Sequence, residues 1–173
     1  DKGLTLSQAV KLLRTRDYFA SMMVKQGEAD ALVSGYSRSY PEVIKPILKV
    51  IGKARGVRKI AATNLMITSK GPIFLSDTSI NIDPSYNELA YISIMTANTA
   101  KMFGYNPVTA MLSYSNFGSS SHPMANKVEN AVKFLRRSHP NMIVDGPIQS
   151  DFALNKLMLT NKFEEINFKL DKL

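Results

Sequence analysis

Apolar residues recur along this chain at two spacings, one typical of amphipathic helices and one of short buried strands. Leu6, Val10 and Leu13 repeat every three to four residues behind a capping residue, Thr5 or Ser7, and predict a helical segment that continues to Gly27. Further helices are predicted over 41–51, 84–103 and 124–138 and from residue 149 onward. Short apolar runs predict strands at 29–34, 59–68, 72–77, 108–112 and 141–145.

The order of these elements predicts an α/β fold with a largely parallel sheet. Strands 59–68 and 72–77, joined by a short Ser-Lys-Gly connection, are expected to form a hairpin that marks a second lobe. We therefore predict part of a first α/β lobe over 1–53, a second α/β lobe over 54–155, and a C-terminal segment over 156–173 that returns toward the first lobe. The tail ends without a helix stop, so we expect the chain to be a piece of a longer protein.

The amino-acid composition excludes several kinds of site. The 173 residues are 45% hydrophobic and include no cysteine, which excludes disulfides, thiolate catalysis and cysteine-bound zinc and fits a cytoplasmic protein. No signal peptide is apparent and no apolar run reaches the roughly 20 residues of a membrane span, so no membrane association is expected. His122 and His139 each adjoin a proline at the end of a predicted element, which favours surface loops over a catalytic triad.

The formal net charge of +8 fits nucleic acid, an anionic membrane or a polyanionic small molecule as partner. The positive residues are spread along the chain, and only 53–59 forms a cluster, without interleaved aromatic residues that could stack bases. We expect no nucleic-acid partner. A basic nucleic-acid binder stays an alternative that a test of oligonucleotide retention would decide.

A hydroxyl-rich loop follows the predicted strand 108–112 and precedes the helix at 124–138. Backbone N–H groups and hydroxyls at the start of a helix suit an anion, and ligands of open α/β sheets bind at this end of the strands. A plain connecting loop is the alternative. The residues concerned are Ser113, Ser115, Asn116, Gly118, Ser119, Ser120 and Ser121.

A second candidate anion site lies at the start of the helix 41–51. Ser37, Arg38 and Ser39 precede that helix, and Lys45 is one turn further along it, so hydroxyls and two cations could share one anion. Solvated surface charges are the alternative. Elsewhere, Asp77 and Asp83 are interpreted as a turn and a helix cap, and Gly146-Pro147 as the turn that ends strand 141–145.

Several segments resemble the phosphate acetyl/butyryl transferase family. They are GEADALVSG (27–35), SINIDPSYNELA (79–90), TANTAKMFG (96–104), AMLSYSNFGSS (110–120) and VDGPIQSDFAL (144–154), and the match runs in order from about residue 12 to residue 155. Within that family, SYPEVIKP (39–46) and SNFGSS (115–120) resemble the version fused to bacterial NADP-dependent malic enzymes.

The resemblance implies a two-lobed, three-layer α/β/α fold, similar to phosphotransacetylases and to isocitrate and isopropylmalate dehydrogenases. It also implies a cleft for coenzyme A and acyl phosphate between the lobes, and a dimer or larger homo-oligomer. On one wall it places Ser34, Gly35, Ser37, Arg38, Ser39 and Lys45, and on the other Ser113, Ser115, Asn116, Gly118 and Ser119, with Asp145, Gly146, Gln149 and Asp151 beside them.

The chain departs from the transferases in both segments. Stand-alone phosphotransacetylases typically carry threonines ahead of an arginine in the first and Ser-Thr-Lys-Gly-Ser in the second, where this chain has Tyr40, Lys45, Asn116 and Phe117. The family's catalytic segment would lie past residue 173, so we assign no catalytic residue here.

The resemblance thus implies a regulatory domain that binds acetyl-CoA as effector and mediates oligomerisation. NADP and a divalent metal are expected only on the malic-enzyme portion. The alternatives are a fragment of an active phosphate acetyltransferase and an assembly module that has lost its ligand.

Overall fold

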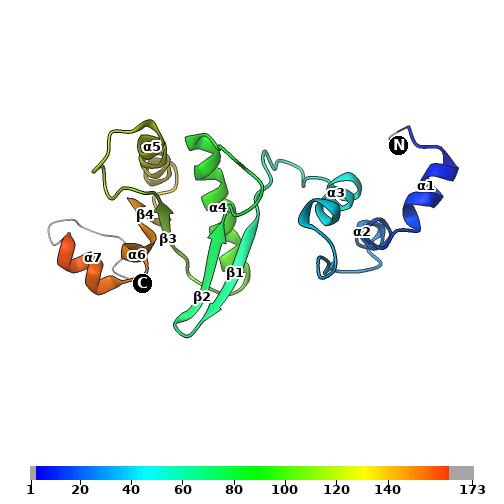
Figure 1. The fold of residues 1–173 in the computed structure, drawn as a ribbon, viewed down its shortest axis with the longest axis horizontal. Helices are drawn as coiled ribbons and strands as arrows, with labels where there is room; N and C mark the ends of the chain where they lie inside the picture. The colour runs from blue at the N-terminus through cyan, green and yellow to red at the C-terminus, as the bar shows by residue number, and fades with distance from the viewer. Residues whose placement is uncertain (1–2, 164–173) are drawn as a thin grey trace. The chain divides into compact units, whose positions relative to one another are not determined.

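The computed structural model describes residues 3–163, which form two compact units that divide between Arg58 and Lys59 (Figure 1). The assignment of lobes to 1–53 and 54–155 stays a prediction, as does the return of 156–173 toward the first lobe. Of that last segment, residues 164–173 lie outside the described residues.

The first unit contains three helices, α1 (Leu6–Leu13), α2 (Arg16–Gln26) and α3 (Tyr40–Val50). Of the two predicted caps, Thr5 is the one that caps α1: its hydroxyl accepts from the Gln8 N–H at 3.3 Å, and the Gln8 side chain accepts from the Thr5 N–H at 2.9 Å. The segment predicted as one helix up to Gly27 is two helices. Arg14 is the C-cap of α1, and the extended Thr15 is the N-cap of α2. The Thr15 hydroxyl donates back to the Leu12 carbonyl at 2.7 Å and does not cap α2.

The strand predicted at 29–34 does not form, and this prediction was wrong. The segment has no regular secondary structure, and Val33 is fully exposed. A strand is stable only when its N–H and C=O groups pair with a neighbouring strand. The described residues of the first unit supply only helices.

The second unit contains one hairpin, one parallel strand pair and four helices among its described residues. Strands β1 (Thr63–Thr68) and β2 (Gly71–Ser76) pair antiparallel and confirm the predicted hairpin, although β1 starts four residues later than expected. Strand β3 (Val108–Leu112) pairs in parallel with β4 (Ile143–Ile148). The largely parallel sheet is therefore a single parallel pair, because 29–34 is not a strand and β1 and β2 pair with each other. The helices are α4 (Tyr86–Met102), α5 (Pro123–Ser138), α6 (Ser150–Ala153) and α7 (Lys156–Lys162).

The turn before α4 is organised by Asp77. Burial alone would raise the pKa of this carboxyl, but hydrogen bonds donated by the Ala62 N–H at 2.9 Å and by Asn81 outweigh it and hold the pKa below its usual range. Asp83 is not the helix cap, contrary to prediction. Ser85 caps α4 together with Glu88, and Asp83 instead pairs with Lys127 of α5.

Strand β4 continues through Gly146-Pro147, where the sequence predicted a turn. Ala110 pairs with Asp145 and Leu112 pairs with Ile148, so β4 carries one residue more than β3 over this stretch. Such a bulge turns the following side chain to the opposite face of the strand pair. Gly146 makes it possible, since it has a φ of 133° and lies so close to β3 that a Cβ would be 2.5 Å from the Met111 carbonyl oxygen.

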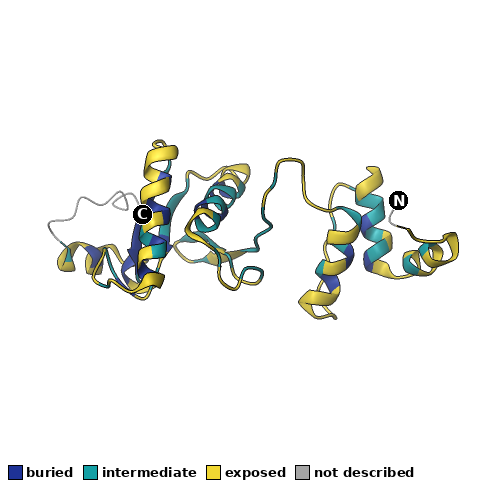
Figure 2. Ribbon diagram, turned by 90° about the horizontal axis from the view of Figure 1, so that it is seen from above, coloured by how far each residue is buried: buried dark blue, intermediate teal, exposed yellow. Residues whose placement is uncertain are grey.

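The bulge places apolar clusters on both faces of the β3–β4 pair, giving the second unit a local three-layer arrangement. On one face, Met111 and Val144 pack with α4 and α5. On the other, Val108, Ala110 and Ile148 pack with α6 and α7. The predicted apolar face of α5 is confirmed, because Val128, Ala131, Val132 and Leu135 are all buried. Figure 2 shows that the buried positions of this unit are mainly on α4, α5 and β4.

Replacing Gly146 by alanine tests the close approach of the two strands. Gly146→Ala should lower the free energy of unfolding by about 3 kcal/mol or more, because the methyl group meets backbone that cannot move aside. Gly71→Ala is the matched control. Gly71 has a similar φ of 118° but nothing within 4 Å of an added Cβ, so only backbone strain of about 1–2 kcal/mol is expected. Urea titration of the intact protein measures both, and equal losses would contradict the steric argument.

Candidate functional site

The hydroxyl-rich loop after β3 is hydrogen-bonded to the end of β4. Ser113 donates its N–H to the Ile148 carbonyl at 2.9 Å, and Phe117 donates its N–H to the Pro147 carbonyl at 2.7 Å. Asn116 and Gln149 form a reciprocal pair: the Asn116 Nδ2 donates to the Gln149 Oε1 at 2.6 Å, and the Gln149 N–H donates to the Asn116 Oδ1 at 2.8 Å. Asn116 and Gln149, both predicted ligands, are thus brought together, and the two hydrogen bonds between them occupy both the oxygen and the nitrogen of the Asn116 side-chain amide.

Phe117 anchors the centre of this loop. It has a φ of 41°, and Gly118 follows with a φ of 81°, so the chain turns sharply at this point. The turn directs the Phe117 ring into the apolar cluster of Ile148 and Phe152, where it lies edge-on to Phe163 at a centroid distance of 5.2 Å. The residue at this position is therefore an apolar anchor and supplies no cation to the loop.

The hydroxyls of the loop differ in their surroundings. Ser115 is buried, and its N–H donates to the Ser113 hydroxyl at 3.4 Å. The Ser119 hydroxyl accepts from the Asn116 N–H at 3.1 Å and stays on the surface together with Gly118. The backbone N–H groups of Ser113, Ser115, Asn116, Phe117 and Ser119 all donate within the protein, so this turn offers a ligand mainly its surface hydroxyls.

Asp145 and Gly146 have structural roles beside the loop. Asp145 is only 2% exposed, and its Oδ1 accepts from Arg136 at 2.5 Å and from the Gly146 N–H at 2.8 Å. The carboxylate is thereby balanced and ties β4 to the C-terminal turns of α5. Asp151, by contrast, lies exposed in the first turn of α6.

In the first unit, the predicted residues Ser34 and Arg38 both contact Asp17, which the sequence analysis did not single out. Asp17 is 4% exposed in the first turn of α2, and its carboxylate accepts from the Ser34 hydroxyl at 2.8 Å and from Arg38 at 2.5 Å. The contacts span 17 and 21 residues of sequence, and no local pattern could have revealed them.

Ser39 also makes its hydrogen bonds within the protein, at the start of its own helix. Its N–H and hydroxyl both donate to the Glu42 carboxylate, at 2.9 and 2.6 Å, and form the capping box of α3. The hydroxyl of Ser39 is the main cause that holds the pKa of Glu42 below its usual range, followed by the Ser39 N–H. Gly35, Ser37 and Lys45 lie exposed, and Gly35 has a φ of 112°.

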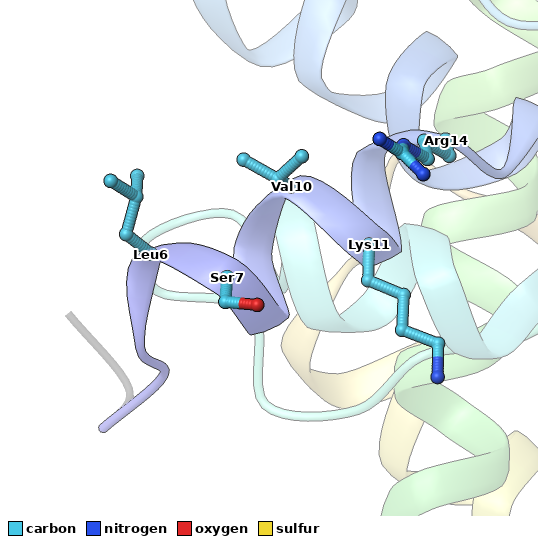
Figure 3. Close-up of a pocket in the computed structure, with 5 residues that line it drawn as sticks. All are labelled: Leu6, Ser7, Val10, Lys11 and Arg14. Atoms are coloured by element: carbon cyan, nitrogen blue, oxygen red, sulfur yellow. The ribbon is translucent and has the colours of Figure 1, made fainter.

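The structure thus assembles two local groups, one around the loop after β3 and one around Asp17. The ligand roles that the sequence assigned to their members stay predictions. A surface pocket lies elsewhere, along α1, and Figure 3 shows its lining of Leu6, Ser7, Val10, Lys11 and Arg14, none of which was a predicted ligand. Over residues 3–163, no three histidine, aspartate or glutamate side chains gather closely enough to hold a metal ion. In the same range, no helix has the length and apolar character that crossing a membrane requires.

The chain belongs to the phosphate acetyl/butaryl transferase family, whose sequence model matches residues 1–169. This agrees with the resemblance found in the sequence. Two solved structures share the fold: the EutD phosphotransacetylase from Staphylococcus aureus, with a TM-score of 0.81 and 32% identity, and a phosphotransacetylase from Streptococcus pyogenes, with a TM-score of 0.77 and 36% identity. These alignments cover 98% and 93% of this chain, and 52% and 50% of the two solved chains.

Curated relatives include malic enzymes and phosphate acetyltransferases. The chain is 34% identical to the NADP-dependent malic enzyme of Escherichia coli, over 97% of this chain and 22% of the enzyme. It is 37% identical to the phosphate acetyltransferase of Bacillus subtilis, over 96% of this chain and 52% of that protein. The chain therefore spans about a fifth of the one relative and about half of the other.

The ion pair at Asp17 leads to a prediction about the first unit. Arg38→Ala should lower the free energy of opening of α2 by about 1–2 kcal/mol, because a buried carboxylate loses a charged donor. The double variant with Asp17→Asn should recover part of that loss. Hydrogen exchange of the α2 amides in the intact protein measures the change. Arg14→Ala, at an exposed position, is the control and should change the free energy of opening of α2 by less than about 0.5 kcal/mol. Equal effects of Arg38→Ala and Arg14→Ala would contradict the structural role of the pair.

Proposed function

We propose that this domain is the phosphotransacetylase-like part of a cytoplasmic NADP-dependent malic enzyme, that it binds acetyl-CoA as a regulatory ligand, and that it mediates oligomerisation. NADP and a divalent metal would bind only on the malic-enzyme portion. The family membership and the relatives of both kinds make an acyl-CoA or acyl phosphate the ligand class to test.

The observation that carries the regulatory proposal is the position of Phe117. The resemblance places a lysine at this position in stand-alone transferases, where an ammonium could stabilise the negative charge that develops as acetyl moves between phosphate and thiol. Here an apolar ring lies in the cluster with Phe152 and Phe163, and the neighbouring Asn116 is bonded to Gln149. The loop contains several hydroxyls but has no cation at its centre.

Lys45 is the sharper probe of ligand binding on the first unit. It is exposed on α3, one turn beyond the capping box, so its removal leaves the packing of the helix unchanged. Arg38 is a poor probe, because it also supports Asp17. A compact ammonium can attract phosphate groups of coenzyme A as a point charge, although it lacks the bidentate geometry of arginine.

Titration of acetyl-CoA into the intact protein, followed by calorimetry, tests the binding proposal. Wild type should show saturable heat, and Lys45→Ala should raise the Kd roughly tenfold, the usual effect of losing one charge-assisted contact. Lys70→Ala removes the same charge from the exposed turn of the β1–β2 hairpin and should leave the Kd unchanged. No heat at about 1 mM ligand would end the acetyl-CoA proposal and favour a pure assembly module.

The second candidate is a fragment of an active phosphate acetyltransferase, which the 37% identity to the Bacillus subtilis enzyme favours. Under our proposal, the intact protein incubated with acetyl-CoA and inorganic phosphate forms no acetyl phosphate above the uncatalysed background. Turnover by wild type would overturn the regulatory proposal in favour of the transferase.

A further inference from the structure

His122 caps the N-terminus of α5, a role that the sequence did not indicate. Its Nδ1 accepts a hydrogen bond from the Met124 N–H at 3.3 Å, and the residue itself is extended, as an N-cap must be. A backbone N–H can only donate, so this bond requires an unprotonated Nδ1 and hence a neutral imidazole with its proton on Nε2. The cap therefore exists in only one charge state of the ring.

The same histidine is connected to the hydroxyl-rich loop. The His122 ring lies edge-on to Tyr114 at a centroid distance of 6.2 Å. The backbone N–H of His122 donates to the Ser120 hydroxyl at 3.2 Å. The Ser120 hydroxyl also pairs with the Tyr114 hydroxyl at 2.9 Å. The cap of α5 and the outer part of the loop thus form one hydrogen-bonded network.

We propose that His122 is a pH-sensitive cap, and that protonation of its ring loosens the start of α5 and the adjoining loop. Protonation of Nδ1 removes the acceptor for Met124, and it puts a positive charge at the positive end of the helix dipole. Both effects disfavour the closed network. Because His122 is exposed, the proton reaches it from solvent.

The first turn of α5 has no acidic residue. The titratable group facing the ring from the loop is Tyr114, and the charged side chain next along α5 is Lys127, whose ammonium is paired with Asp83. The inference does not depend on what the loop binds, so it can fail while the proposed function stands.

His139, the other histidine of the chain, supplies a matched control on the same helix. It is the C-cap of α5, and its Nδ1 lies 2.9 Å from the Ser138 hydroxyl. A proton on His139 would face the negative end of the helix dipole, although Arg136 and Arg137 in the last turn are like charges. Its removal should therefore leave the N-terminal network unaffected.

Hydrogen exchange of the peptide spanning 113–126 in the intact protein tests the proposal, with protection factors corrected for the intrinsic effect of pH. In wild type and in His139→Asn, protection should fall about fivefold between pH 7.5 and pH 5.5, the equilibrium equivalent of losing a typical N-cap. In His122→Asn, which caps without titrating, it should stay constant. His122→Asp is a second non-titrating cap in that range, should the asparagine variant fail to fold.

Three outcomes would overturn the proposal. Constant wild-type protection across the range would show that protonation does not open the network. The same fall in His122→Asn or His122→Asp would assign it to another group. A fall abolished by His139→Asn would assign it to the opposite end of the helix.

Discussion

The contact between Gly146 and the backbone of Met111 is the constraint on which the second unit depends. An extra residue in β4 fits beside β3 only because no side chain stands between the two strands at this point. That residue turns Ile148 to the face opposite Val144, so one short strand supplies both apolar clusters. It also brings the carbonyls of Pro147 and Ile148 to the positions where the loop after β3 bonds to them. The shape of the candidate site is therefore a consequence of backbone packing in the sheet.

Elements specified by neighbouring residues could be predicted from the sequence. The spacing of Val128, Ala131, Val132 and Leu135 located the buried face of α5, and the capping position of Thr5 marked the start of α1. The strand at 29–34 was predicted wrongly because its apolar run says nothing about a pairing partner. Gly146-Pro147 was taken for a turn because this dipeptide usually ends a strand. Nothing local reveals that Met111, 35 positions earlier, requires a glycine beside it.

In the candidate site, too, local features could be predicted from the sequence and long-range contacts could not. The sequence selected the loop ends at which polar residues gather, and the structure does bring Asn116 to Gln149 and Ser34 to Arg38. What local patterns could not supply is the bonding partner of each side chain. Asp17 is close to Arg38 only because α2 and the chain before α3 pack together. Polar groups that are buried must find partners within the protein, so residue types suited to a ligand can serve the fold instead.

Catalysis and regulation place different demands on the residues of such a domain. Catalysis of acetyl transfer requires charges held where the transition state develops them, and the apolar Phe117 supplies no such charge to the loop. Regulation requires less, because an effector need only bind two states of the protein with different affinity. Substitutions that abolish turnover can therefore leave a regulatory site intact, and the two functions can diverge on one fold.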